Sequence, residues 1–540
     1  MAGEKEERRR SQGPESRGED REELLWLSIL ELTELYRKRE VSPVEVERLA
    51  EERLLRQEPT LHAYMQITLD EARAAARRAE AQFKLGARVK QASSLSPLCG
   101  VPFTVKDLFD VRGLPTTCGS RAFDRRPLPG ENAFVADHVL DAGGVLMGKT
   151  TLREFAYADD HPDFGVTCSP WDVARSTGGS SKGSAASVAA GQAFFSIGTE
   201  TGASTRAPAA FCGLVGLKPT FGLLSRSGLV LLSGSCDHVG VLARTAADVA
   251  VVLNEIAEYD PDDPVMDRGA PVDYVRAALG RAAAGGSTGG AAGSEGSTGS
   301  TGSSGSVPSL KGLRAGVLVR DFEAPTAEPV RRAVWEAVEV LKGLGLEVRE
   351  IEVPRLDDAV KAWSVIVGAE AAAHHQDALR RRAPGYSPAT LERLRAGLRI
   401  PAVDYLEAQE LRRHFADSLA RVFAGGVDLL LGPTMSTVAR PFSAEAPGRD
   451  IAPALRRSCP YPLTGYPVLS VPCGFGTDEV SSTGTEGGEG SGGSGGSGGT
   501  AVELPIGLQI AGRPWEEGLL LRVAHAYQQA TGWHRRHPAL

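Results

Sequence analysis

The chain has 540 residues, 42% of them hydrophobic, which is enough to bury a large core in one domain or two. Its formal net charge of −8 argues against a nucleic-acid-binding surface, because such surfaces are basic. The seven cysteines are widely scattered without a C-x-x-C pair, which indicates a reducing compartment and argues against disulfides and a zinc site.

Residues 1–22 are almost all charged or turn-forming, and we expect them to form a disordered tail. Leucines at helical spacing predict a helix over residues 24–39, and Ser42-Pro43 is typical of the start of a second one. An alanine- and arginine-rich stretch predicts a third helix over residues 72–85. We find no secretory pattern and no early apolar run long enough to cross a bilayer, so we expect a cytoplasmic protein.

Two glycine-rich turns, at residues 178–181 and 198–203, present Ser180 and Ser204. A small-residue helix and a short apolar strand are predicted between them. Glycine lets backbone N–H groups converge at such turns, which suits a nucleophile beside an oxyanion hole. A P-loop is excluded because Lys182 is followed by glycine, and no G-x-S-x-G elbow surrounds Ser204. A glycine-rich loop that only connects two elements explains the same pattern, so spacing alone leaves both interpretations open.

Four segments share their residues and their order with the amidase signature family. They are PLCGVPFTVKD at 97–107, GGSSKGS at 178–184, GTETGASTRAPA at 198–209 and FCGLVGLKPT at 211–220. The family's patterns are PL-x-GVPF-x-VKD, GGSS-x-GS, GTDTGGSIR-x-PA and FCG-x-x-GLKPT, and the chain resembles this family on that basis. The resemblance implies an α/β fold with a mixed central sheet covered by helices on both faces.

The same resemblance implies a catalytic triad, with Ser204 as the nucleophile, Ser180 as a bridging serine held by a cis peptide bond, and Lys106 as the base. Lysine has an ordinary pKa near ~10.4 and needs a lower value to act as a base at neutral pH. Burial disfavours the charged form, so we expect the apolar run at 101–109 to lower the pKa of Lys106. Ser180 would relay the proton from Ser204 to Lys106 and later to the departing amine. No metal or organic cofactor is implied.

The implied oxyanion hole consists of the backbone N–H groups of four consecutive residues, Thr201, Gly202, Ala203 and Ser204. Three residues of these segments are unexpected beside the family pattern. Glu200 replaces an aspartate, Ala203 replaces a glycine, and Lys182 places a cation at a helix start, where the helix dipole disfavours it. If residue 203 needs a positive φ, alanine is strained there and activity falls. Asp237-His238 has the residue types of an acid–base pair, but the family uses this stretch as a wall of the site.

In the C-terminal half, a strand, a helix and a strand are predicted over residues 311–318, 329–341 and 346–353, with Gly343 just past the end of the helix. This order indicates a parallel strand pair in an α/β sheet. A further strand pair is expected at 468–471 and 507–510.

Residues 285–306 and 481–500 are rich in glycine and serine, which is typical of flexible coil. The second of these inserts interrupts the strand pair expected on either side of it. The family pattern resumes after each insert, so we interpret both as surface-loop expansions, which cost little stability. We therefore expect a single domain over residues 23–540.

The favoured function is a stand-alone amidase that hydrolyses a small or aryl amide to the acid and ammonia or an amine through an acyl-serine. One alternative is the glutaminase subunit, the A subunit, of a Glu-tRNA(Gln)/Asp-tRNA(Asn) amidotransferase, and another is a weakly active or non-catalytic relative. In that glutaminase subunit, two segments resemble GGSIRQP and SSLDQIGP. In this chain, Ala207 follows Arg206 where the first pattern has glutamine, and the second segment contains Cys236-Asp237-His238-Val239. The expected substrate partner is a small-molecule amide. The expected assembly is a homodimer, formed with a second copy of the chain. Neither nucleic acid nor a membrane is expected to bind directly.

Overall fold

The computed structural model describes residues 21–88, 92–267, 269, 271–280, 307–320, 325–444, 452–477 and 502–540. Of the expected N-terminal tail, only residues 21 and 22 are described, and they are helical. The two inserts expected at 285–306 and 481–500 lie outside the described residues. None of the helices in the described ranges is both long and apolar enough to cross a membrane.

The described strands are β1 (Tyr64–Ile67), β2 (Pro102–Lys106), β3 (Val145–Thr150), β4 (Cys168–Ser169), β5 (Asp172–Ser176), β6 (Phe195–Glu200), β7 (Val215–Lys218), β8 (His238–Ala243), β9 (Arg314–Leu318), β10 (Glu347–Ile351), β11 (Leu429–Pro433), β12 (Val468–Gly476) and β13 (Leu504–Gly512). The α-helices are α3 (Ile29–Lys38), α4 (Pro43–Leu61), α5 (Leu69–Arg88), α6 (Phe134–Asp141), α7 (Lys182–Ala189), α8 (Arg206–Cys212), α9 (Ala246–Ile256), α10 (Tyr274–Ala278), α12 (Glu328–Gly343), α13 (Leu356–Arg382), α14 (Pro388–Gly397), α15 (Ala402–Ala424), α16 (Ala452–Ser458), α17 (Pro460–Thr464) and α18 (Glu517–Ala530).

Eleven of the described strands form one mixed sheet, in the order β1-β3-β2-β6-β8-β7-β12-β13-β11-β9-β10. Strand β2 lies between β3 and β6 and runs parallel to both, while β8, β7, β12 and β13 continue the sheet by antiparallel pairing. Every residue of β2, β3, β6 and β7 is buried, as expected for central strands with both faces covered. The mixed sheet predicted from the sequence is confirmed.

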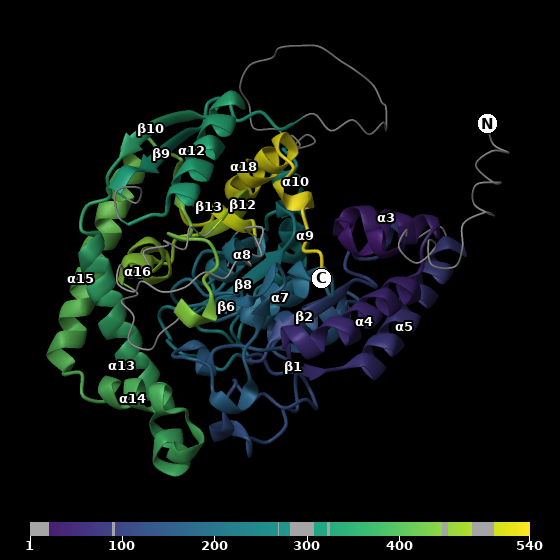
Figure 1. Ribbon diagram of the computed structural model, residues 1–540, viewed down its shortest axis with the longest axis horizontal. Coiled ribbons are helices and arrows are strands. Elements are labelled where there is room, and N and C mark those ends of the chain that lie inside the picture. The colour runs from purple at the N-terminus through teal and green to yellow at the C-terminus, as the bar shows by residue number, and fades with distance from the viewer. Residues whose placement is uncertain are drawn as a thin grey trace, which may run out of the picture.

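Helices cover the sheet on both faces. Helices α9, α12 and α18 pack on its central and C-terminal strands, and α7 and α8 pack on β2, β6, β7 and β13. The long helices α13 and α15 pack on each other and form a further layer with α14, drawn in green in Figure 1. Apolar residues of this layer, among them Ile366, Phe415 and Leu419, form a second core cluster together with residues of the sheet such as Leu430 and Val468.

Several predicted elements differ from the structure at their ends. The helix expected over 24–39 is broken at Ser28, whose side chain and that of Glu31 form a capping box that starts α3. The helix expected over 329–341 runs through Gly343, and Gly345 is the glycine that adopts a positive φ after it. The parallel pair β9–β10 forms as predicted, and the strand pair expected at 468–471 and 507–510 forms and is antiparallel, as β12–β13.

Candidate active site

Lys106 is the last residue of β2, at the carboxyl end of a strand that has parallel neighbours on both sides. The register places Val105 opposite Ile197 of β6, so Lys106 lies beside the last residues of β6. Ligand sites in sheets with parallel strands commonly form at this edge. The side chain of Lys106 is 0% exposed.

Three hydroxyl groups surround the Lys106 amine. Its Nζ lies 2.7 Å from Ser180 Oγ, 3.0 Å from Ser181 Oγ and 2.7 Å from Thr199 Oγ1. The Ser181 hydroxyl donates its own hydrogen to the Thr199 carbonyl at 3.1 Å. A neutral amine has two hydrogens and one lone pair, so it can donate to two of these oxygens and accept from the third. Since the Ser181 hydrogen is already used, the hydroxyl groups that can donate to the neutral lysine are those of Ser180 and Thr199.

Burial lowers the pKa of Lys106 to about 7, against partial opposition from the nearby carboxylates of Asp237 and Glu200. Desolvation is the largest cause, because every atom of the amine has left water. A substantial fraction of Lys106 is therefore neutral near pH 7, which is the state that can accept a proton.

Ser180 lies two residues before the start of α7, next to the N-cap residue Ser181, and the peptide bond between Gly179 and Ser180 is cis, as the resemblance implies. Helix α7 begins against the backbone of the N-terminal region. A Cβ on Gly183 would lie 2.1 Å from the Ala63 carbonyl oxygen, so this close approach requires glycine. The packing fixes the turn that carries Ser180 next to Lys106.

Ser204 is carried by the second turn, which lies beside the first. The Ser181 N–H donates to the Ser204 carbonyl at 3.2 Å, and Ser204 is 9% exposed. In the described part of the chain, no hydrogen bond joins Ser204 Oγ to Ser180 Oγ. Catalytic hydrogen bonds are often longer in the free enzyme and shorten when substrate binds. The two turns thus lie side by side, and Lys106 and Ser180 are in direct contact.

The turn before Ser204 carries the backbone donors expected for an oxyanion hole. Within the described residues, the four N–H groups from Thr201 to Ser204 meet no acceptor, as an oxyanion site requires. Ala203 does not have a positive φ, so alanine fits this position without the strain that a left-handed conformation would bring. The departure from glycine at residue 203 therefore brings no left-handed strain.

Glu200 and Arg206 form a completely buried ion pair beneath this turn. Glu200 also accepts from the N–H groups of Thr205 at 3.1 Å and Arg206 at 3.2 Å, which caps the start of α8. Arg206 donates to the Gly202 carbonyl at 3.0 Å and to the Ser458 carbonyl at 2.8 Å. The glutamate at position 200 is therefore fully engaged in supporting the turn.

Asp237 braces the same turn from the other side. Its carboxylate accepts from the Thr201 hydroxyl at 2.6 Å and from the N–H groups of Leu232 and Ser233 at 2.6 and 2.9 Å. Burial lowers the pKa of the neighbouring His238 well below its usual value, and its Nδ1 lies 2.8 Å from the Cys236 carbonyl. The pair does not act as an acid–base couple in this geometry, because Asp237 contacts Thr201 and the histidine ring contacts the backbone.

Lys182 forms an ion pair with Asp160, and its side chain is only 4% exposed. The pairing compensates for a cation at the start of α7. The charges that act on the pKa of Lys106 come from the carboxylates of Asp237 and Glu200. Lys182 is thus committed to Asp160 and does not depress the pKa of Lys106.

Sequence reasoning missed three residues of this site. Ser181 and Thr199 lie inside the family motifs, directly next to Ser180 and Glu200. Their hydroxyl groups at these positions could have identified them as site residues. Trp363 donates from its Nε1 to the Thr201 carbonyl at 2.7 Å, and its ring lies against Gly202. No local pattern points to it, because it is 162 positions away in the chain. In the described ranges, no three His, Cys, Asp or Glu side chains gather as a metal site would need.

A family model named Amidase matches residues 46–521. The chain belongs to the amidase family. It is also 35% identical to the A subunit of the glutamyl-tRNA(Gln) amidotransferase of Chloroflexus aurantiacus, over 93% of this chain and 96% of that one. The same subunit of Synechococcus elongatus is 34% identical over 95% of this chain and 100% of its own length. The native peptide amidase of Stenotrophomonas maltophilia has the same fold, with a TM-score of 0.73 and 26% identity over 95% and 98% of the two chains.

This member of the amidase family is therefore an amide-hydrolysing enzyme with the amidase signature fold. The partners expected from the sequence, those of a simple homodimer of a small-molecule amidase, are wrong. The similar relatives are named as one subunit of an amidotransferase, which overturns that expectation. The same relatives support the amidotransferase alternative better than the favoured stand-alone amidase.

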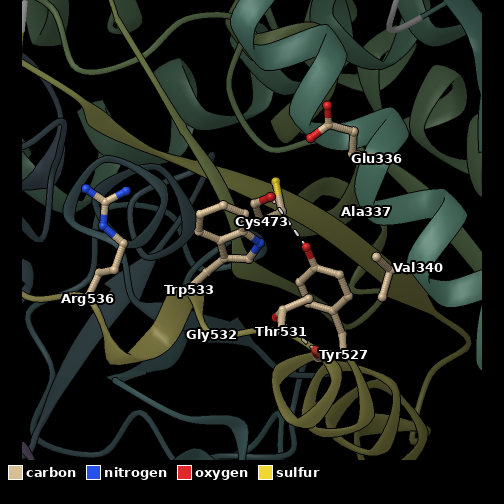
Figure 2. A pocket seen from close by; sticks show the side chains of 9 residues that line it. All are labelled: Glu336, Ala337, Val340, Cys473, Tyr527, Thr531, Gly532, Trp533 and Arg536. Carbon is tan, nitrogen blue, oxygen red and sulfur yellow. Dashed lines mark hydrogen bonds between the residues drawn. The ribbon is translucent and has the colours of Figure 1, made fainter.

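A cavity of about 450 Å³ lies elsewhere in this amidase, between α12, β12 and α18. Its lining includes Tyr527, Trp533 and Arg536 but none of the residues around Lys106 (Figure 2). The cavity is separate from the serine turns and has no part in the arrangement described above.

Proposed function

We propose that this chain is the glutaminase subunit of a Glu-tRNA(Gln) amidotransferase, and that it releases ammonia from glutamine for use by other subunits. The similarity to such subunits along almost the whole of both chains carries the proposal. The buried contact between Lys106 and Ser180 supports hydrolytic competence. We also propose that residues 23–540 act as one domain and that the protein works in the cytoplasm.

In the proposed mechanism, Ser204 Oγ attacks the carbonyl carbon of the amide. Its proton moves to Ser180 Oγ while the Ser180 proton moves to the neutral amine of Lys106. This direction agrees with the hydrogen-bond arrangement, in which Ser181 is occupied as a donor and Ser180 is free to donate to Lys106. A C–O bond forms, and the carbonyl oxygen becomes an oxyanion.

The N–H groups from Thr201 to Ser204 stabilise that oxyanion. A single donor of this kind contributes roughly 3 kcal/mol to transition-state stabilisation. The C–N bond then breaks, and the proton returns from Lys106 through Ser180 to the nitrogen, which leaves as ammonia. A water molecule attacks the acyl-serine by the same proton path and yields the acid and free Ser204.

A second candidate is an amidase that acts on another amide without transferring its nitrogen. It is favoured by Ala207 and by the Cys236-Asp237-His238-Val239 segment, which differ from the patterns of the glutaminase subunit. The similarity in fold to a peptide amidase is compatible with this candidate as well.

Ammonia release by the purified chain separates the two candidates. The substrates are glutamine and a panel of aliphatic, aromatic and peptide amides, with and without the remaining subunits of an amidotransferase and Glu-tRNA(Gln). We expect the chain to hydrolyse glutamine, and we expect the rate to increase when the other subunits and the tRNA are present. Hydrolysis of other amides with no turnover of glutamine in either state would refute it and support the second candidate. Ser204→Ala serves as the inactive control.

A further inference from the structure

We call residues 201–204 the oxyanion turn. The carbonyl oxygens of three consecutive peptide groups in this turn accept hydrogen bonds. The Thr201 carbonyl accepts from Trp363 Nε1 at 2.7 Å, the Gly202 carbonyl from Arg206 at 3.0 Å, and the Ala203 carbonyl from the Ala207 N–H at 2.8 Å. In a trans peptide the C=O and the following N–H point in opposite directions. Each bond therefore aims the next N–H, those of Gly202, Ala203 and Ser204, to the other side of the turn.

Trp363 differs from the other two donors in its origin. Arg206 and Ala207 are the first two residues of α8, which begins two residues after Ser204, so their bonds follow from the local chain path. Trp363 comes from α13, in the outer helical layer. Its ring also limits the space at Gly202, where a Cβ would lie 3.0 Å from the indole Cζ2. The direction of the Gly202 N–H thus depends on an element distant in sequence.

Helix α13 is itself fixed against the loop that braces Thr201. Glu370, two turns beyond Trp363, accepts from the Ser233 hydroxyl at 2.6 Å and from the Ser235 N–H at 2.9 Å. The same loop carries Asp237, which holds the Thr201 hydroxyl. Thr201 is therefore held at its carbonyl by α13 directly and at its hydroxyl by a loop bound to α13.

We infer that Trp363 is a positioning residue, which orients the Thr201–Gly202 peptide so that the Gly202 N–H meets the oxyanion. The inference rests on the proposed function, because the oxyanion forms only when Ser204 attacks an amide. The Lys106 amine bonds to three hydroxyl groups, and the Trp363 indole bonds to the turn instead. Loss of the indole N–H therefore affects the oxyanion and leaves proton transfer intact.

Trp363→Phe tests the inference, because it keeps an aromatic ring and removes the N–H donor. We expect kcat to fall about 10- to 100-fold, less than the loss of a whole oxyanion donor, with KM changed less than about threefold. The apparent pKa of the kcat/KM profile should stay unchanged. The matched control is Trp171→Phe, which removes an indole bond of 2.9 Å to the Cys212 carbonyl at the far end of α8.

Affinity for phenylboronic acid gives a readout without turnover, because boron bonded to Ser204 Oγ forms a tetrahedral anion. Its dissociation constant, measured by calorimetry, should rise in Trp363→Phe by about the same factor as kcat falls. Gly202→Ala, whose methyl group pushes against the indole, should show the same pattern if Trp363→Phe fails to fold.

Unchanged kcat and boronate affinity in Trp363→Phe would overturn the inference, and so would an equal loss in Trp171→Phe. A wild-type chain that binds phenylboronic acid more tightly than Trp363→Phe, yet hydrolyses no glutamine, would refute the proposed function alone. Boronate binding that persists in Ser204→Ala would refute the nucleophile on which both depend.

Discussion

Raising the pH from 6 to 9 is expected to increase kcat/KM through one apparent pKa near 7, followed by a plateau. Burial lowers the pKa of Lys106 from 10.5 to about 7, so about half of the amine is neutral at pH 7. At the ordinary value only roughly one amine in three thousand would be neutral, so burial increases the active fraction by roughly a thousandfold. Below pH 7 the rate should fall about tenfold per unit. Initial rates of ammonia release in buffers of constant ionic strength measure the profile.

A second buried lysine provides the matched control. Burial also lowers the pKa of Lys218 to about 7, and its Nζ donates to the Pro219 carbonyl at 2.7 Å. Lys218→Met should keep the inflection of the profile, whereas Lys106→Met should abolish hydrolysis. A profile that is flat from pH 6 to 9, or that rises only near pH 10, would refute Lys106 as the base. Loss of the inflection in Lys218→Met would refute the assignment of the inflection to Lys106 rather than to Lys218.

The same pKa shift predicts how stability depends on pH. Between pH 7 and 10.5 the unfolded chain binds a proton at Lys106 that the folded chain does not, so the free energy of unfolding rises with pH. Below pH 7 the amine is charged in both states and the full cost of burying it is present. Relative to Lys106→Met, the wild type should gain up to about 1.4 kcal/mol per pH unit over this window. Urea unfolding at pH 7, 8 and 9 measures the difference, and a constant difference would contradict the shift.

Three further predictions concern the departures from the family pattern and the second insert. Ala203→Gly should change kcat less than about twofold and lower the free energy of unfolding by about 0.5–1 kcal/mol, because Ala203 has no positive φ to relieve; a large rise in kcat would contradict this. Lys182→Gly should lower the melting temperature and leave the pH profile in place, since Lys182 pairs with Asp160; a shifted inflection would show that it acts on Lys106. Replacing residues 481–500 by a short turn should preserve activity and melting temperature, because glycine and serine bury little apolar surface, and loss of soluble protein would refute the loop interpretation.

The sequence by itself was enough to predict the family and the helix and strands around the two serine turns. Small residues after Ser181 form α7, and Gly191, which follows it, has a positive φ as expected for a helix end. The largely apolar run at 101–109 contains the buried strand β2, and the apolar segment at 194–197 forms the first part of the buried strand β6. These features follow from propensity and hydrophobic pattern, which act over a few neighbouring residues.

Only the tertiary structure decided what surrounds the Lys106 amine and what holds the oxyanion turn. Thr199 meets Lys106 because β2 and β6 pair in one register, and Trp363 meets Thr201 because α13 packs beside the turn. Lys182 and Glu200 looked like defects in the sequence, yet Asp160 and Arg206 neutralise them. The pKa of a lysine depends on all the atoms that displace water from it, and sheet register depends on strands far apart in the chain. No local pattern encodes either quantity, so both become defined only when the whole sheet and its helical layers assemble.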